Sequence, residues 1–169
     1  MRKRKHTRIK DYDYSQAGYY YITICTQGKL PRLANIKVGR GLAPAAAELT
    51  PKGKVIEEQL LVLPHRYPYV KIDKYVIMPT HIHAILVLTA ETAGANPRPT
   101  LMDIVCTFKS ISARLCNQHS HVKSRKIWQS SFYDEVIRNE TAYRDIWEYI
   151  DTNPQKWNED IYFCDSSPD

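Results

Sequence analysis

Long apolar runs are absent from this sequence of 169 residues. None approaches the roughly 18–20 consecutive apolar residues of a membrane-spanning helix, and residues 1–10 lack the apolar centre of a secretory signal peptide. The four cysteines form no C-x-x-C pair, which excludes a zinc ribbon and a dithiol redox motif. These absences predict a cytoplasmic protein with reduced cysteines and no membrane partner.

Acidic residues are also absent from the first ten positions, where six bases account for the whole net charge of +6. These bases are Arg2, Lys3, Arg4, Lys5, Arg8 and Lys10. The other 159 residues balance 18 bases against 18 acids. We therefore define residues 1–14 as a basic arm, which favours a polyanionic partner, nucleic acid before an anionic membrane. A solubilising tail is the alternative.

Hydrophobic periodicity and turn residues predict the first half of the fold. Residues 19–26 are β-branched and aromatic, as in a strand, and residues 28–48 indicate an extended excursion. Thr50 and Pro51 begin a helix that Pro64 ends. The segments 69–78 and 81–88 predict an antiparallel hairpin.

The second half repeats this order, with a helix over residues 101–115 and a strand near 132–137. Asn139 caps a last helix that Pro154 closes. The element order predicts an α+β fold. It is a ferredoxin-like split β-α-β antiparallel sheet with helices packed on it, and with an added C-terminal helix.

A second basic segment spans residues 98–126, which contain six bases and one acid. Candidate DNA contacts from the arm and from this segment are Arg2, Lys3, Arg4, Lys5, Arg8, Lys109, Arg114, Lys123, Arg125 and Lys126. A solvated loop is the alternative for the last three. Residues 127–169, in contrast, contain ten acids and three bases, so some of these carboxylates must face away from DNA.

Two short patterns carry the chemistry. His81 and His83 lie on either side of Ile82 in a predicted strand, so both imidazoles project from one face. Together with a third ligand, the two imidazoles can bind a divalent metal. In the last helix a buried stripe is predicted from Tyr143, Ile146, Trp147 and Ile150. Tyr149 and Asn153 lie off this stripe as i and i+4 neighbours, so they face the same way.

Three motifs in the same order give the chain a specific resemblance. The segment Met78-Pro-Thr-His81-Ile-His83 resembles the His-hydrophobe-His motif of HUH endonucleases. Residues 128–139 and 148–154 are similar to the REP-associated tyrosine transposases, relatives of the insertion-sequence-200-like single-tyrosine transposases. The similarity defines a domain over residues 15–158 and leaves 159–169 as a C-terminal tail.

The resemblance implies a role for each matched residue. His81 and His83 would ligate Mg²⁺ or Mn²⁺, Asn153 would complete the site where some relatives have Gln, and Tyr149 would be the nucleophile. It also implies cleavage and rejoining of single-stranded or hairpin DNA through a 5′-phosphotyrosine, without a nucleotide cofactor. A homodimer is left open.

Two other functions remain open on the sequence alone. One is a repeat-hairpin DNA-binding protein that no longer cuts. The other is a metal phosphodiesterase in which water attacks and Tyr149 is structural. The sequence does not identify the base that deprotonates Tyr149, whose phenol has an ordinary pKa of about 10.

Overall fold

A four-stranded antiparallel sheet forms the centre of the computed structural model, which describes residues 8–37, 44–90, 98–120 and 125–163. The strands are β1 (Gly18–Cys25), β4 (Val70–Ile77), β5 (His81–Leu88) and β6 (Tyr133–Ile137). Their order is β4-β5-β1-β6, and each neighbouring pair is antiparallel. With helices between β1 and β4 and between β5 and β6, this is the ferredoxin-like topology, so the predicted fold class is confirmed.

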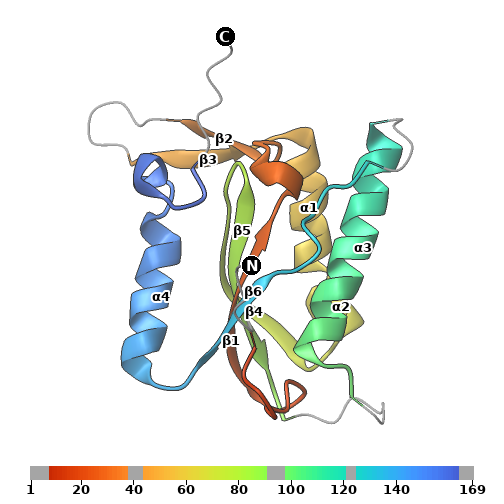
Figure 1. Cartoon of the computed structure of the whole chain (residues 1–169), viewed down its shortest axis with the longest axis vertical. Helices are drawn as coiled ribbons and strands as arrows, with labels where there is room; N and C mark the ends of the chain where they lie inside the picture. Colours follow the sequence, from red (N-terminus) through yellow and green to blue (C-terminus); the bar gives the residue numbers. More distant parts are fainter. Residues whose placement is uncertain (1–7, 38–43, 91–97, 121–124, 164–169) are drawn as a thin grey trace, which may run out of the picture.

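Helices cover both faces of the sheet (Figure 1). The helices are α1 (Pro51–Leu61), α3 (Leu101–His119) and α4 (Glu140–Thr152). The larger core lies between the sheet and the layer of α1 and α3, and a smaller one, centred on Tyr21, Ile85 and Ile150, lies beneath α4. The sheet therefore separates two differently lined halves of the molecule.

Alternation along β1 decides which side chains face which layer. Tyr20, Ile22 and Ile24 are fully buried in the larger core, whereas Tyr21 and Thr23 point to the α4 side. Every second side chain of β1 and β5 therefore points to the α4 face. These side chains do not fill the larger core and can form a functional site.

Side-chain caps fix the beginnings of the three long helices. Thr50 accepts a hydrogen bond from Gly53 N, Asn139 accepts one from Ala142 N, and Thr100 forms a capping box with Asp103. The first helix ends at Leu61, and Pro64 lies in a separate short helix, α2 (Leu63–Arg66).

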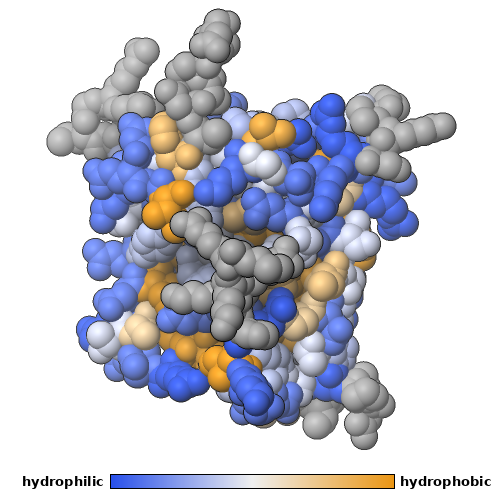
Figure 2. Space-filling view, viewed as in Figure 1, coloured by the Kyte–Doolittle hydropathy of each residue, from blue (hydrophilic) through white to orange (hydrophobic). Residues whose placement is uncertain are grey.

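The segment expected to be an extended excursion contains a small hairpin, β2 (Ala34–Lys37) and β3 (Ala46–Leu49). The start of this hairpin packs closely on α1. The carbonyl of Leu33, the residue before β2, lies so near Gly53 of α1 that a Cβ there would clash with it. Two short 3-10 helices complete the chain, η1 (Gln27–Lys29) and η2 (Trp157–Glu159). Hydrophilic residues cover most of the face in Figure 2, and no helix among the described residues has the length and apolarity to cross a membrane.

Candidate active site

Two buried imidazoles lie side by side on the α4 face of β5. His81 and His83 are both 0% exposed, and their ring centroids are 4.3 Å apart. Ile82, between them, is buried in the opposite core. The strand spacing therefore brings both rings to one side of the sheet, as the sequence predicts.

Hydroxyl groups hold one nitrogen of each ring. His83 Nδ1 lies 2.7 Å from Tyr21 Oη and 2.9 Å from Thr23 Oγ1, and His81 Nδ1 lies 3.1 Å from Thr80 Oγ1. When Nδ1–H donates to such a hydroxyl, the lone pair remains on Nε2. Both Nε2 atoms are buried and have no hydrogen-bond partner among the described residues.

Asn153 and Asp160 add oxygen atoms to the same cluster. Asn153 is the C-cap of α4 and 2% exposed, and its Nδ2 donates to Asp160 Oδ2 at 2.8 Å. Its Oδ1 is buried without a partner in the described part of the chain. Asp160 Oδ2 lies 3.9 Å from His81 Nε2, and one ligand atom each of His81, His83 and Asp160 lies within 4.8 Å of the others.

This donor set fits a divalent cation. Two imidazole nitrogens, an amide oxygen and a carboxylate are ligands that Mn²⁺ accepts, and oxygen-rich sites also suit Mg²⁺. A buried polar atom without a partner costs about 1–3 kcal/mol, and His81 Nε2, His83 Nε2 and Asn153 Oδ1 are three such atoms. A cation ligated by these atoms would remove that cost.

Burial keeps the imidazoles in the form that can bind a metal. Removal from water lowers the pKa of His81 to about 3 and holds the pKa of His83 well below 6.5. Both rings are therefore neutral at pH 7 and do not need to lose a proton before they ligate a cation.

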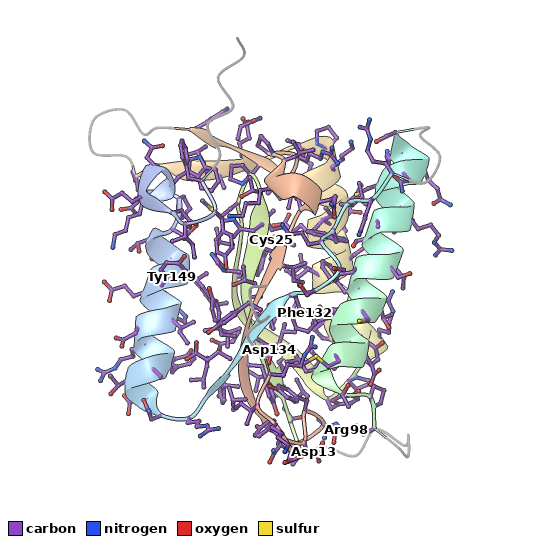
Figure 3. All side chains as sticks on the ribbon, in the orientation of Figure 1. Asp13, Cys25, Arg98, Phe132, Asp134 and Tyr149 are labelled. Carbon is purple, nitrogen blue, oxygen red and sulfur yellow. The ribbon has the colours of Figure 1, made fainter. Side chains whose placement is uncertain are left out.

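Tyr149 lies on α4, one turn before Asn153, and remains 39% exposed (Figure 3). Its ring centroid lies 5.2 Å from that of His83, and its hydroxyl donates to Asp160 Oδ2 at 3.4 Å. Burial, and next the negative charge of Asp160, raise the pKa of Tyr149 to about 12. The phenol is therefore accessible, close to the imidazole pair and protonated at neutral pH.

The stripe predicted for α4 is wrong at one position. Trp147 is 38% exposed, because it lies beside the sheet edge with the Lys74 ammonium 3.7 Å from its ring centroid. Ile150 is fully buried, and Tyr143 is half-buried with its hydroxyl donating to Asp73 Oδ2 at 2.7 Å. The apolar contact of α4 is narrower than the sequence indicates.

The chain after α4 folds back over the imidazoles, a contribution that sequence reasoning missed. Thr80 Oγ1 donates to Tyr162 O at 3.0 Å, Lys29 Nζ donates to Ile161 O at 3.3 Å, and the Tyr162 ring centroid lies 4.7 Å from that of His81. From the sequence alone, residues 159–169 are expected to be a C-terminal tail. No periodic pattern marks Asp160, because the segment that carries it is not a regular helix or strand.

Comparison with known proteins supports the architecture. No family model matches the chain. A Haemophilus influenzae protein of uncharacterized function is 29% identical over 177 aligned residues, which cover 96% of this chain and 94% of that protein. A solved structure of a REP-associated tyrosine transposase bound to a REP hairpin matches with a TM-score of 0.55 and 21% identity, over 88% of this chain and 73% of that one. The chain has the fold of a REP-associated tyrosine transposase.

A candidate transposase from Deinococcus radiodurans is also similar, at 17% identity over 85% of this chain and 95% of that one. The TM-score of this match is 0.49. The resemblance drawn from the sequence is thus confirmed for the fold, while the roles of the individual residues stay predictions.

Those candidate DNA contacts that the structure describes do not gather around Tyr149. Arg2, Lys3, Arg4, Lys5 and Lys123 lie outside the described residues. Arg114, Arg125 and Lys126 are exposed, on α3 or just after it, and α3 packs on the face opposite α4 (Figure 1). Figure 3 likewise shows Arg98 near the start of α3, away from Tyr149.

The other two candidates make contacts within the protein. Arg8 Nε lies 3.5 Å from the buried Asp134 carboxylate, and its guanidinium covers the Phe132 ring. Lys109 Nζ donates to Ser130 O at 3.0 Å. Burial is the main cause of the lowered pKa of His81, and the positive charge of Lys29 lowers this pKa further.

Proposed function

We propose that this protein cleaves and rejoins single-stranded DNA at hairpin-forming repeats, with Tyr149 as the nucleophile. The observation that carries the proposal is the grouping of His81, His83 and Asp160, with one ligand atom of each within 4.8 Å of the others, beside the accessible phenol of Tyr149. The fold supports it, because the REP-associated tyrosine transposase with the same fold is bound to a REP hairpin.

The reaction is a transesterification. Tyr149 Oη attacks the phosphorus of a phosphodiester, the bond between phosphorus and the 3′-oxygen breaks, and a free 3′-hydroxyl leaves. The strand on the 3′ side of the cleaved bond remains on the protein, joined through its 5′ phosphate to Tyr149 Oη as a phosphotyrosine ester. Because the product is again a phosphodiester, attack by a 3′-hydroxyl reverses the step and reseals the DNA without ATP.

Asp160 gives the phenol its orientation and a route for its proton. The hydroxyl of Tyr149 already donates to Asp160 Oδ2. As the new bond to phosphorus forms, the phenol oxygen loses its affinity for the proton, which passes to Oδ2. The leaving 3′-oxygen takes up a proton from solvent.

His81, His83 and Asn153, with Asp160 beside them, would hold the divalent cation. A bound cation would supply positive charge next to the phosphate oxygens, where negative charge develops during attack. Asn153 is placed for this by the end of α4, which also carries Tyr149 one turn earlier. The helix therefore links the position of the nucleophile to that of the ligand.

Covalent trapping tests the proposal. An oligonucleotide with a repeat hairpin and single-stranded flanks, incubated with Mn²⁺, should give a protein–DNA adduct that survives denaturation in SDS. Tyr149→Phe should abolish the adduct but keep the DNA affinity, since only one hydroxyl is lost.

Tyr143→Phe is the matched control, because Tyr143 lies on the same helix as Tyr149. Its hydroxyl contacts Asp73 and not the metal-binding cluster. Cleavage by the wild type without an adduct would favour the water-using phosphodiesterase. Binding without cleavage would favour the inactive hairpin-binding protein.

A further inference from the structure

A pocket of about 460 Å³ opens next to Tyr149, and its lining includes Tyr21 and Thr23, the two residues whose hydroxyls contact His83 Nδ1. Its wall on α4 includes Asp145, Ile146 and Tyr149, its floor includes Tyr133, and the returning segment contributes Ile161 and Tyr162. Small-ligand pockets typically measure about 300–1,000 Å³, so there is room for one planar heterocycle. The metal-binding cluster does not account for this pocket.

An aromatic ring is fixed at the floor with part of its surface free. Tyr133 is the first residue of the edge strand β6 and is 41% exposed. Its hydroxyl donates to Glu135 Oε2 at 3.0 Å, and its ring packs edge-to-face against Tyr21 with centroids 6.1 Å apart. These contacts orient the ring, and the exposed part can stack with a nucleobase.

A carboxylate, that of Asp145, lines the same pocket as this ring. Asp145 precedes Tyr149 by one helical turn, so both side chains lie on the same side of α4. It is exposed and has no hydrogen bond or ion pair with any residue in the described ranges. A carboxylate repels phosphate but accepts a hydrogen bond from an exocyclic amino group, as acidic side chains do with cytosine N4.

We infer that this pocket binds a nucleobase with an exocyclic amino group, stacked on Tyr133 and donating to Asp145. The base belongs to a nucleotide next to the phosphodiester that Tyr149 attacks. This inference rests on the proposed function and extends it, because it assigns a base preference to the cleavage site itself and not only to the hairpin.

Binding measured without catalysis tests the inference separately from the proposed function. The full chain with Tyr149→Phe, in EDTA, is titrated with fluorescein-labelled (dC)₁₀ and (dU)₁₀, whose bases differ in an amino group against a carbonyl oxygen. We expect (dC)₁₀ to bind about tenfold more tightly, as for one hydrogen bond to a charged acceptor. Asp145→Ala should bring the ratio of the two affinities close to one, and the ratio cancels any change in phosphate repulsion.

Stacking is tested with the ring. Tyr133→Leu should lower the affinity for (dC)₁₀ about tenfold and leave that for an abasic ten-mer unchanged. Tyr19→Ala, which removes an exposed tyrosine packed on Tyr143 outside the pocket, should alter neither. As a second measure, the fluorescence of 2-aminopurine placed in the oligonucleotide should be quenched by the protein that retains Tyr133 and not by the Tyr133→Leu variant.

The outcomes separate the two hypotheses. Equal affinities for (dC)₁₀ and (dU)₁₀, or a Tyr133→Leu variant that binds and quenches like its parent, would overturn the pocket assignment even if Tyr149 forms the adduct. Loss of the adduct alone would overturn the proposed function and leave these binding ratios in place.

Discussion

Replacing Asp160 with asparagine should weaken metal binding through the neighbouring amide. Asp160 Oδ1 accepts from Tyr162 N at 2.7 Å, while Oδ2 accepts from Asn153 Nδ2 at 2.8 Å and from Tyr149 Oη. Asp160→Asn leaves one acceptor oxygen in place of two. If that oxygen keeps Tyr162 N, the new NH₂ meets the NH₂ of Asn153. The Asn153 amide must then rotate so that its Oδ1 accepts from the new NH₂, and this oxygen is no longer free to ligate a cation.

The size of the effect follows from these contacts. Loss of a partner that orients a ligand typically costs about 10–100-fold in metal affinity, or about 1.4–2.7 kcal/mol. Isothermal titration with Mn²⁺ measures it directly. At saturating Mn²⁺ the adduct should also form more slowly, because the Tyr149 proton has lost its carboxylate acceptor.

Glu148→Gln is the matched control, since it neutralises an exposed acid on α4 whose side chain contacts none of the atoms in the cluster. The reasoning is refuted if Asp160→Asn binds Mn²⁺ within twofold of the wild type and forms the adduct at the same rate. Asp160 would then only fasten the returning segment to the end of α4.

Three further predictions address charge and stability. Deleting residues 1–7 removes four bases but keeps Arg8. The slope of log affinity for single-stranded DNA against log salt concentration should become shallower by about 0.7 per lost phosphate contact. An unchanged slope would show that the arm serves solubility. Arg8→Ala should cost about 1–3 kcal/mol in urea unfolding, because Asp134 is left buried without its cation, and full stability would contradict this. In EDTA the unfolding free energy should fall by about 3 kcal/mol from pH 6.5 to 5, because the unfolded chain takes up protons at His81 and His83 that the folded protein does not. Constant stability would contradict the low imidazole pKa values.

Local patterns in the sequence predict the framework of the fold and part of the site. Alternation places His81 and His83 on one face, and helical spacing places Tyr149 and Asn153 on one side of α4. The caps at Thr50 and Asn139 are equally local, because each depends on a hydrogen bond within one turn. These features need no knowledge of distant contacts.

Features that depend on tertiary contacts could not be predicted in this way. Asp160 reaches the imidazoles only because the chain reverses after α4, and nothing periodic marks that return. Trp147 has the helical spacing of the predicted buried stripe of α4, but its ring stays partly exposed and contacts the Lys74 ammonium of β4. Likewise, the acidic residues of α4 and the basic residues of α3 lie on opposite faces of the sheet, an arrangement that charge counts along the chain do not show.

Peptide mapping of the trapped adduct tests the central claim most directly. Trypsin should release residues 145–156 as one peptide, which contains Tyr149 and no other tyrosine. Tyr133, Tyr143 and Tyr162 fall in three other peptides. After nuclease digestion of the DNA, the account predicts a 5′-phosphodeoxynucleotide on Tyr149 in the 145–156 peptide. The same modification on a different peptide, or cleaved DNA with every tyrosine unmodified, would contradict it.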